Sequence, residues 1–170
     1  GFDTWGNLPK EQRSGVETWI AGSYDPDLNL TYWGTAQSKP WSFLNRGTTP
    51  LDKTLYSAST LALNADTGKL AWYFQASPHD THDWDATSTP VIFDGEIDGR
   101  PRKLLAQASR NGWFFVLDRT SGRNVLSTEY VKTNWSLGYD DKGQPIPNPA
   151  KQPQVAGALV TPNQGGATNW

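Results

Sequence analysis

The chain has 170 residues, with 15 Lys or Arg against 17 Asp or Glu and a formal net charge of −2. Such a balanced charge provides no electrostatic attraction for nucleic acid or an anionic membrane, so nucleic acid is not an expected partner. Cys is absent, which excludes disulfides, cysteine-ligated zinc and thiol nucleophiles. No apolar run approaches the roughly 20 residues that span a bilayer, and no secretory signal opens the chain.

The composition predicts an all-β fold. Nine Trp, six Tyr, 16 Gly and 12 Pro accompany few long helical patterns, a combination typical of short strands joined by turns. Each expected strand is close to the usual length of roughly 5–6 residues. In chain order, the expected strands cover residues 18–24, 29–34, 55–63, 70–75, 90–93, 103–108, 113–118 and 124–130.

Turn residues separate the expected strands. Asp25-Pro26-Asp27 predicts an Asx turn in which proline sets φ, and Asp94-Gly95 together with Asp98-Gly99 predicts a hairpin-like excursion. Residues 138–170 are rich in proline and glycine. Because proline removes backbone donors, this range is expected to be a long extended loop within the domain, of the kind that is usually functional or disordered.

One seven-residue segment occurs twice. Residues 63–69, Leu-Asn-Ala-Asp-Thr-Gly-Lys, are echoed by residues 117–123, Leu-Asp-Arg-Thr-Ser-Gly-Arg. The offset from Gly68 to Gly122 is 122 − 68 = 54 residues, near the roughly 40–50 residues of a propeller blade and lengthened by a loop. A β-propeller of four-stranded blades is the favoured fold. Two unrelated hairpins that share a common turn are the alternative.

Residues 77–85, Ser-Pro-His-Asp-Thr-His-Asp-Trp-Asp, concentrate three carboxylates and two imidazoles. Acids this close repel one another unless a cation or a bound proton compensates, so the segment indicates a metal site or acid/base chemistry. Asp83 and Asp85 alternate, which on an extended chain places both on one face. A metal site of His79, His82 and Asp83 is a further possibility. No Gly-x-Ser-x-Gly elbow or Cys nucleophile indicates a hydrolase.

Several motifs resemble the quinoprotein alcohol dehydrogenases, which use pyrroloquinoline quinone (PQQ) on an eight-bladed β-propeller. The motifs are Thr18-Trp19, residues 23–30 (Ser-Tyr-Asp-Pro-Asp-Leu-Asn-Leu), residues 32–35 (Tyr-Trp-Gly-Thr), residues 66–72 (Asp-Thr-Gly-Lys-Leu-Ala-Trp) and Pro78-His79-Asp80 leading into Asp83-Trp84-Asp85. The resemblance implies that residues 1–170 are part of such a propeller, about two to three blades whose tryptophan-docking turns stack Trp rings between blades.

The resemblance implies a different role for each acid of the cluster. Asp83 matches the family's catalytic aspartate, a general base that takes the hydroxyl proton of an alcohol while hydride moves to the quinone, and that also contacts the metal. Asp85 stands where lanthanide-using members carry an additional aspartate, so the metal is implied to be Ca²⁺ or a lanthanide ion. The structural alternatives are a turn cap for Asp83 and a solvated loop acid for Asp85. His79 and Asp80 fit loop architecture better.

Further positions match the family's cofactor and metal site. Trp19, directly after Thr18, matches the indole on which the planar quinone lies, and Arg110 matches the basic residue that reaches the quinone oxygens. Asn169 resembles the family's Asn-Trp near the cofactor. Gln37 stands where the family has a metal-ligating asparagine, so its amide oxygen reaches the metal only if the ion or the backbone shifts.

The resemblance also implies a small alcohol as substrate, a cytochrome c as electron acceptor and the periplasm as compartment. The chain contains no Met and ends at Asn169-Trp170, so it is expected to be a piece of a longer protein and inactive alone. The alternative function is a non-catalytic propeller module that binds proteins or glycans through its aromatic residues. Gln37 and His82, which replaces a usual Trp, favour that alternative.

Overall fold

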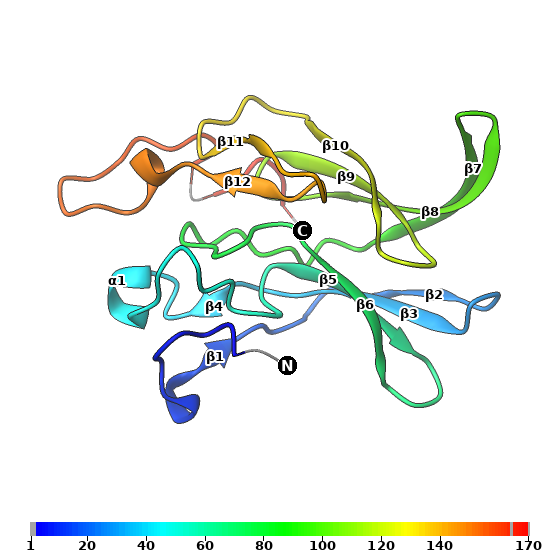
Figure 1. Ribbon diagram of the computed structural model, residues 1–170, viewed down its shortest axis with the longest axis horizontal. Helices are drawn as coiled ribbons and strands as arrows, with labels where there is room; N and C mark the ends of the chain where they lie inside the picture. Colours follow the sequence, from blue (N-terminus) through cyan, green and yellow to red (C-terminus); the bar gives the residue numbers. More distant parts are fainter. Residues whose placement is uncertain (1–2, 164, 170) are drawn as a thin grey trace.

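The structure is a computed structural model that describes residues 3–163 and 165–169. It contains four antiparallel sheets, two of four strands and two of two strands, and only short helices (Figure 1). In the described ranges no helix is both long enough and apolar enough to cross a bilayer. The all-β prediction is confirmed.

Each four-stranded sheet connects neighbouring strands in chain order, which is the pattern of a propeller blade. The first blade consists of β2 (Ser23–Asp25), β3 (Leu30–Gly34), β5 (Ser59–Asn64) and β6 (Leu70–Gln75). The second blade consists of β7 (Val91–Ile97), β8 (Arg100–Ala108), β9 (Trp113–Asp118) and β10 (Asn124–Glu129). The first strands of the two blades, β2 and β7, lie next to each other.

Two small sheets flank the blades. One pairs β1 (Ser14–Gly15) with β4 (Ser38–Lys39), and the other pairs β11 (Ser136–Tyr139) with β12 (Pro145–Pro147). The helical turns are η1 (Lys10–Gln12), α1 (Phe43–Arg46) and η2 (Pro149–Lys151). Residues 138–170 are therefore not loop throughout, because they include most of a short hairpin. Proline is tolerated in β12 because that strand has one partner only.

All eight expected strands overlap a strand of the two blades, but two local predictions differ from the structure. Within residues 18–24 only the last two lie in β2, because the chain before them runs beside the β4 segment, where Ala36 N donates to Glu17 O at 2.9 Å. Asp94-Gly95 is not a turn: Asp94 lies inside β7, opposite Lys103. The hairpin reverses only at Asp98-Gly99, whose φ values of 52° and 70° suit a two-residue turn.

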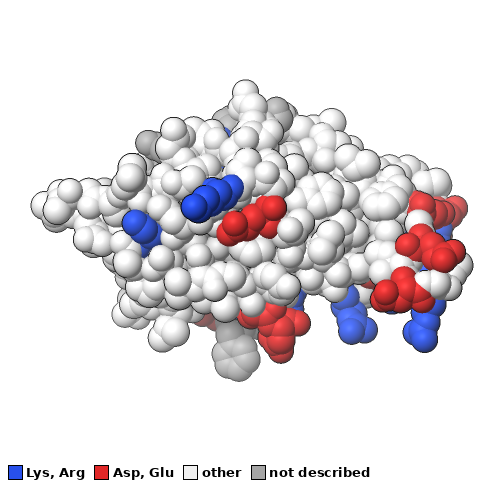
Figure 2. All heavy atoms as spheres, turned by 90° about the horizontal axis from the view of Figure 1, so that it is seen from above, with Lys and Arg blue, Asp and Glu red and all other residues white. Residues whose placement is uncertain are grey.

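The β7–β8 hairpin carries charges of both signs. In the view from above, acidic and basic side chains gather at the end of the molecule where Figure 1 places this hairpin (Figure 2). Asp94 and Lys103 stand opposite each other in the two strands, but Asp94 forms its ion pair with Arg119 and Lys103 forms its own with Asp27 of the first blade.

The seven-residue echo is a structural repeat. Its two copies form the β5–β6 and β9–β10 turns, in which Gly68 N donates to Asn64 O and Gly122 N donates to Asp118 O, both at 2.8 Å. Both glycines are left-handed, with φ of 67° and 72°. The two turns join the third and fourth strands of their blades. The propeller interpretation is therefore confirmed, and the alternative of two unrelated hairpins is wrong.

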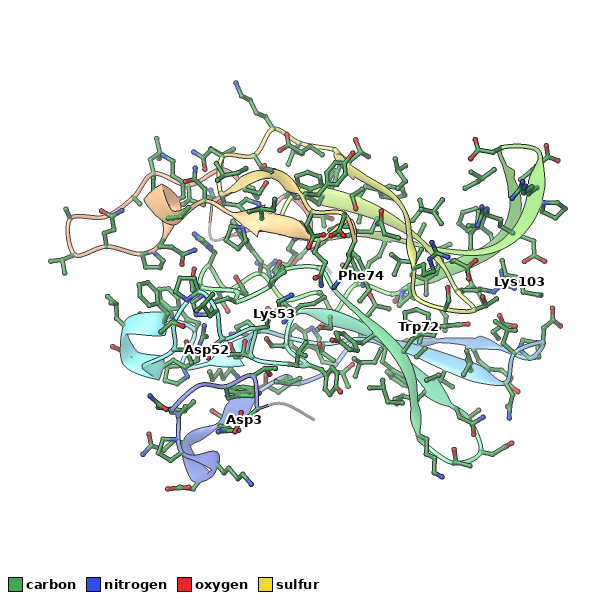
Figure 3. All side chains as sticks on the ribbon, viewed as in Figure 1. Asp3, Asp52, Lys53, Trp72, Phe74 and Lys103 are labelled. Atoms are coloured by element: carbon green, nitrogen blue, oxygen red, sulfur yellow. The ribbon has the colours of Figure 1, made fainter. Side chains whose placement is uncertain are left out.

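The two blades pack through aromatic side chains of β6. Trp72 and Phe74 lie between the blades (Figure 3), and Phe74 meets Phe115 of β9 with ring centroids 5.1 Å apart. A Cβ added to Gly122 would lie 2.6 Å from Trp72 Cε3, so only glycine lets the indole approach this turn. Trp72 Nε1 also donates to Arg119 O at 3.1 Å. Trp72, from the predicted tryptophan-docking motif of the first blade, therefore docks on the corresponding turn of the second blade.

Arg119 adds a buried ionic link between the blades. Its Nε donates to Asp25 Oδ2 and its Nη1 to Asp94 Oδ1, both at 2.6 Å. Burial pushes the pKa of Asp25 upwards, but the hydrogen bond and charge of Arg119 outweigh that effect and hold the pKa below its usual value. The predicted Asx turn starts at the same carboxylate, since Asp25 Oδ1 accepts from Asp27 N at 3.0 Å.

Candidate functional site

Asp80 organises the loop of residues 77–85, which connects β6 to β7. This carboxylate is 3% exposed and accepts hydrogen bonds from His82 N at 2.9 Å and from Trp84 N at 2.8 Å. Burial raises the pKa of Asp80. Its two backbone contacts hold the loop that carries Asp83, so Asp80 serves loop architecture, as predicted.

The two imidazoles of the loop point to different partners. His79 is 2% exposed, its Nε2 lies 3.1 Å from Thr48 Oγ1, and burial lowers its pKa to about 4. His82 stacks on Trp84 with ring centroids 4.4 Å apart, and its Nε2 lies 2.9 Å from Lys151 O.

The suggested metal site of His79, His82 and Asp83 is therefore wrong. Each imidazole already has a protein partner in a different direction. In the part of the chain that the structure describes, no three His, Cys, Asp or Glu side chains come together in a way that could hold a metal ion. A metal bound here would need the amide of Gln37 or ligands from outside this chain.

Asp83 and Asp85 converge on Gln37. Gln37 Nε2 donates to Asp83 Oδ1 at 2.6 Å, and Gln37 N donates to Asp85 Oδ1 at 3.0 Å. The chain at Asp83 is not extended, because its φ is 66°, a left-handed conformation that Asp adopts more readily than most residues. The two acids therefore meet through a turn, whereas the sequence indicated an alternating strand.

The negative charge of the buried Asp85 carboxylate is only partly compensated by its neighbours. It is 7% exposed, and burial, with the charges of Asp83 and Asp80, raises its pKa to about 6. Arg110 Nη1 lies 3.7 Å from Asp85 Oδ2, at the long end of ion-pair distances. The interpretation of Asp85 as a solvated loop acid does not hold, since its carboxylate is withdrawn from water. A cation beside it would relieve the burial cost.

Arg110 connects the acids to the C-terminal segment. Its side chain is buried beside Asp85, and its Nη2 donates to Gly165 O at 2.9 Å. Its backbone carbonyl accepts from Ala167 N at 2.8 Å. Asn169 follows two residues later and is exposed. Its cofactor role stays a prediction, and its neighbour Trp170 lies outside the described residues.

Thr18 and Trp19 lie at the edge of the same region. Val16 N donates to Gln37 O at 2.9 Å, and this pairing places the exposed Thr18 beside the segment that carries Gln37. The indole of Trp19 remains 45% exposed. The structure thus brings Gln37, Asp83, Asp85 and Arg110 into direct contact and places the Trp19 segment alongside.

Lys39 also lies close to the two acids, although no motif indicated it. This side chain forms an ion pair with Glu17, which is the main reason its pKa is raised, and the charges of Asp85 and Asp83 contribute. The signal was present, because residue 39 lies two positions after Gln37 on an extended segment and so lies on the same side.

A pocket of about 370 Å³ opens beside the Asp83 loop. Its walls are mostly apolar and come from the loop, the segment after β4 and the C-terminal segment. The lining residues are Trp41, Thr81, His82, Lys151, Pro153, Gln154, Gly157, Ala158, Leu159, Val160 and Asn163.

Comparison with known proteins explains this arrangement of blades and acids. Residues 2–159 match the model of the family described as "Glucose/ethanol/alcohol dehydrogenase, beta-propeller domain". The chain belongs to this PQQ-dependent dehydrogenase family. The match covers both blades, the acidic loop and Arg110, so the resemblance inferred from the motifs is confirmed.

Two curated relatives cover nearly the whole chain. The quinohemoprotein alcohol dehydrogenase of Comamonas testosteroni is 38% identical over 98% of the chain and 24% of its own length. The quinoprotein alcohol dehydrogenase PedH of Pseudomonas putida is 40% identical over 98% of the chain and 29% of its own length. The chain therefore spans roughly a quarter of the length of these relatives.

Solved structures of this family superpose well on the two blades. The crystal structure of the Comamonas enzyme matches 92% of the chain and 23% of its own with a TM-score of 0.84 at 38% identity. A europium-containing methanol dehydrogenase matches 91% of the chain and 27% of its own with a TM-score of 0.83 at 29% identity. The fold is thus part of a quinoprotein β-propeller.

The assembled donors fit a hard cation. Asp83 and Asp85 contribute carboxylates and Gln37 a side-chain amide, which are the oxygen ligands that Ca²⁺ prefers. The amide now presents Nε2 to Asp83, and rotation about the last side-chain bond would present its oxygen instead. The buried, poorly compensated carboxylate of Asp85 supports the same conclusion.

Proposed function

We propose that the full-length protein oxidises an alcohol with PQQ and a bound Ca²⁺ or lanthanide ion, and that this chain supplies the general base and part of the cofactor and metal site. The contact of Gln37, Asp83, Asp85 and Arg110 carries the proposal. When bound, the metal-associated quinone would supply the oxidant that accepts hydride from the alcohol carbon. The chain's own residues would help to bind the cofactor and the metal, orient the alcohol and accept its hydroxyl proton.

Asp83 is proposed as the base. Its Oδ1 is held by Gln37 Nε2 at 2.6 Å, whereas its Oδ2 has no hydrogen-bond partner among the residues described. That oxygen can accept the hydroxyl proton of an alcohol placed against it. Because Asp83 is only half-buried, the proton can afterwards pass to solvent.

The neighbouring residues are proposed to hold the metal and the quinone. Asp83, Asp85 and the amide oxygen of Gln37 would contribute metal ligands. Arg110, fixed by Gly165 O and facing Asp85, would place positive charge where negative charge develops on the quinone oxygens.

A stacking surface for the planar quinone and further polar contacts would complete the cofactor site. The exposed indole of Trp19 offers a stacking surface for a planar ring. Thr18 and Asn169, both exposed, would add polar contacts.

The substrate is proposed to bind through its carbon chain in the apolar pocket beside the loop. His82 and Thr81, immediately before Asp83, form one wall of this pocket, and Trp41 and Leu159 form others. Apolar walls favour the carbon chain of a small alcohol, while the hydroxyl would face the carboxylate of Asp83.

Asp83→Asn in the full-length protein tests the proposed base. Turnover is expected to fall at least about 10²-fold, the usual contribution of general base catalysis, with little change in PQQ binding. Asn tolerates the left-handed backbone at this position as Asp does, so the fold should be kept. Asp98→Asn is a matched control, since Asp98 is also left-handed, with φ of 52°, and exposed. Undiminished turnover in Asp83→Asn would contradict the assignment of Asp83 as the base.

We also propose a cytochrome c as electron acceptor and the periplasm as compartment. The Comamonas relative is named a quinohemoprotein, which supports a haem as the next carrier. Reduction of added cytochrome c, followed optically with the purified full-length protein and an alcohol, tests the acceptor. Fractionation of cells that express the full-length protein tests the compartment.

A further inference from the structure

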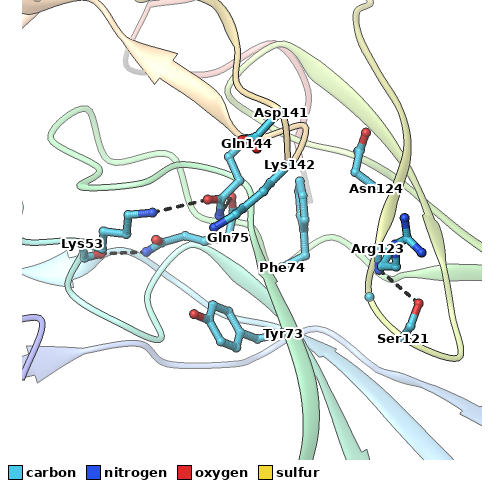
Figure 4. A pocket seen from close by; sticks show the side chains of 11 residues that line it. Lys53, Tyr73, Phe74, Gln75, Ser121, Arg123, Asn124, Asp141, Lys142 and Gln144 are labelled. Carbon is cyan, nitrogen blue, oxygen red and sulfur yellow. Dashed lines mark hydrogen bonds between the residues drawn. The ribbon is translucent and has the colours of Figure 1, made fainter. Parts of the chain in front are cut away.

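A second pocket of about 440 Å³ contains none of the residues proposed for the chemistry (Figure 4). Three separate parts of the fold form it: β6, the β9–β10 turn and the β11–β12 turn, with Lys53 closing one end. Its volume lies in the range of about 300–1,000 Å³ that is usual for small-molecule sites.

The pocket is strongly basic in an acidic chain. Lys53, Arg123 and Lys142 line it, with Asp141 as the one acid, so the local charge is 3 − 1 = +2, whereas the whole chain carries −2. Among the described residues none of the three bases has a carboxylate partner within ion-pair distance. Three cations that line one pocket without an ion-pair partner among the described residues, Lys53 and Lys142 on one side of Phe74 and Arg123 on the other (Figure 4), favour an anion there.

A hydrogen-bonded floor holds the polar groups of the pocket in place. Gln75 Nε2 donates to Lys53 O at 2.7 Å and to Ser57 O at 3.0 Å, so the orientation of this amide is determined. Lys53 Nζ donates to Gln144 Oε1 at 3.4 Å, and the dashed lines of Figure 4 show this link.

One acceptor of this floor has no donor. Gln75 is fully buried, and in the described part of the chain its Oε1 has no hydrogen-bond partner. An unsatisfied buried acceptor is costly, by the loss of roughly one hydrogen bond. A ligand that carries a hydroxyl beside its negative charge would satisfy this acceptor, and the carboxylate of Asp141 is a second one.

The walls of the pocket are rigidly positioned. The β9–β10 turn that presents Arg123 is packed against Trp72 through Gly122. The β11–β12 turn that presents Lys142 is closed by Asp140, whose Oδ1 accepts from Lys142 N and Gln144 N, both at 2.9 Å. Both bases therefore extend from fixed backbone, which lowers the entropic cost of binding.

We propose that this pocket binds a small, multiply charged oxyanion that carries a hydroxyl, such as a hydroxycarboxylate or a protonated phosphate. The anion bridges Lys53 of the first blade, Arg123 of the second and Lys142 of the β11–β12 turn. Binding therefore joins three parts of the fold and stabilises the folded protein by mass action.

Calorimetry and thermal unfolding of the full-length protein test the proposal at constant ionic strength. Citrate, tricarballylate, which is citrate without its hydroxyl, and inorganic phosphate are the probes. We expect saturable binding of citrate, with tricarballylate weaker by up to about tenfold because Gln75 Oε1 then lacks its donor. Tighter binding of phosphate than of citrate supports the oxyanion site and identifies phosphate as its ligand.

Charge-neutral variants separate this pocket from general screening. Arg123→Gln and Lys142→Gln should each weaken binding about tenfold or more. Lys69→Gln should not, because Lys69 is the exposed counterpart of Arg123 in the first blade's turn and lies outside the pocket. Alcohol oxidation should be unchanged in all three variants.

Two results would overturn the proposal. One is no saturable binding of any of the three probes at 10 mM, about the limit of a useful affinity. The other is equal affinity in Arg123→Gln, Lys142→Gln and Lys69→Gln. Equal affinity for citrate and tricarballylate would overturn the assignment of a hydroxyl to Gln75.

Discussion

Asp85 and His79 belong to the same loop and are both buried. Burial moves the pKa values of the two side chains in opposite directions. The pKa of the Asp85 carboxyl rises to about 6, and the pKa of the His79 imidazole falls to about 4. Burial favours the neutral form of both groups. Asp85 lies against Gln37 and Arg110, whereas His79 lies against Thr48, so only Asp85 belongs to the candidate site.

Asp85→Asn is expected to lower the affinity of the full-length protein for Eu³⁺ at least about tenfold, and for Ca²⁺ less. A trivalent ion gains more from each negative ligand than a divalent ion does. Eu³⁺ luminescence titration and competition with Ca²⁺ measure both affinities without any turnover. Asp98→Asn is again the control, and an equal loss for both ions would contradict the lanthanide role.

The lowered pKa of His79 is expected to make the stability of the protein depend on pH. Its pKa is about 4 in the folded protein and near 6.5 when unfolded, so the unfolded chain binds the proton first as pH falls. Stability from this group is complete above pH 6.5 and is lost between about pH 6.5 and 4, by up to about 3 kcal/mol. Denaturant unfolding of wild type and His79→Gln at pH 7 and pH 4.5 should show their difference shrinking at the lower pH. A constant difference would contradict the assignment.

At the level of elements, the repeated turn decides how the blades meet. The same seven-residue turn occurs in both blades, but among the described residues only its second copy receives an indole, where Trp72 packs on Gly122. Arg119, three residues earlier, adds a buried ion pair to Asp25 of the first blade. One turn therefore supplies both the apolar and the ionic contact between the blades.

Gly122→Ala is expected to cost more stability than Gly68→Ala. Both glycines are left-handed, so each substitution costs roughly 1–2 kcal/mol in backbone strain. The new methyl at Gly122 would also lie 2.6 Å from Trp72 Cε3, whereas Gly68 has no neighbour within 4 Å. Overpacking adds about 1–3 kcal/mol at Gly122. Chemical denaturation of the two variants measures the difference, and equal losses would show that Trp72 moves aside freely.

At the level of the whole molecule, the proposed metal and cofactor site is incomplete within this chain. Two carboxylates and one amide meet in it, and the chain spans roughly a quarter of its curated relatives, 24% and 29% of their lengths. Its blades also end in edge strands with unpaired backbone groups. Further ligands and further blades are therefore expected to come from other parts of the protein.

The isolated 170 residues are expected to show no dye-linked alcohol oxidation with added PQQ and either Ca²⁺ or Eu³⁺. The partial ligand set should leave the metal and quinone weakly held, and the open blade edges favour association between copies. The full-length protein in the same assay is the control. Measurable turnover by the isolated chain would show that its ligands suffice.

The eight blade strands could be predicted because alternating apolar residues and Gly, Asp and Pro turns are local signals. The prediction of a turn at Asp94-Gly95 was wrong, because the pairing of these residues with Arg102 and Lys103 of β8 overrides their local turn preference. The β11–β12 hairpin was missed because its prolines indicate a loop. Its pairing depends on an edge position that no local pattern reveals.

The sequence by itself determined the strand pattern, the repeated turn, the acidic cluster and, through its motifs, the family, because these depend on residues close together in the chain. Only the tertiary structure decided that Asp83 and Asp85 both meet Gln37, 46 and 48 residues away, and that His79 and His82 do not join them. It also brought Lys53, Arg123 and Lys142 around one pocket. Such contacts arise from the packing of whole blades, which depends on many weak interactions between distant segments.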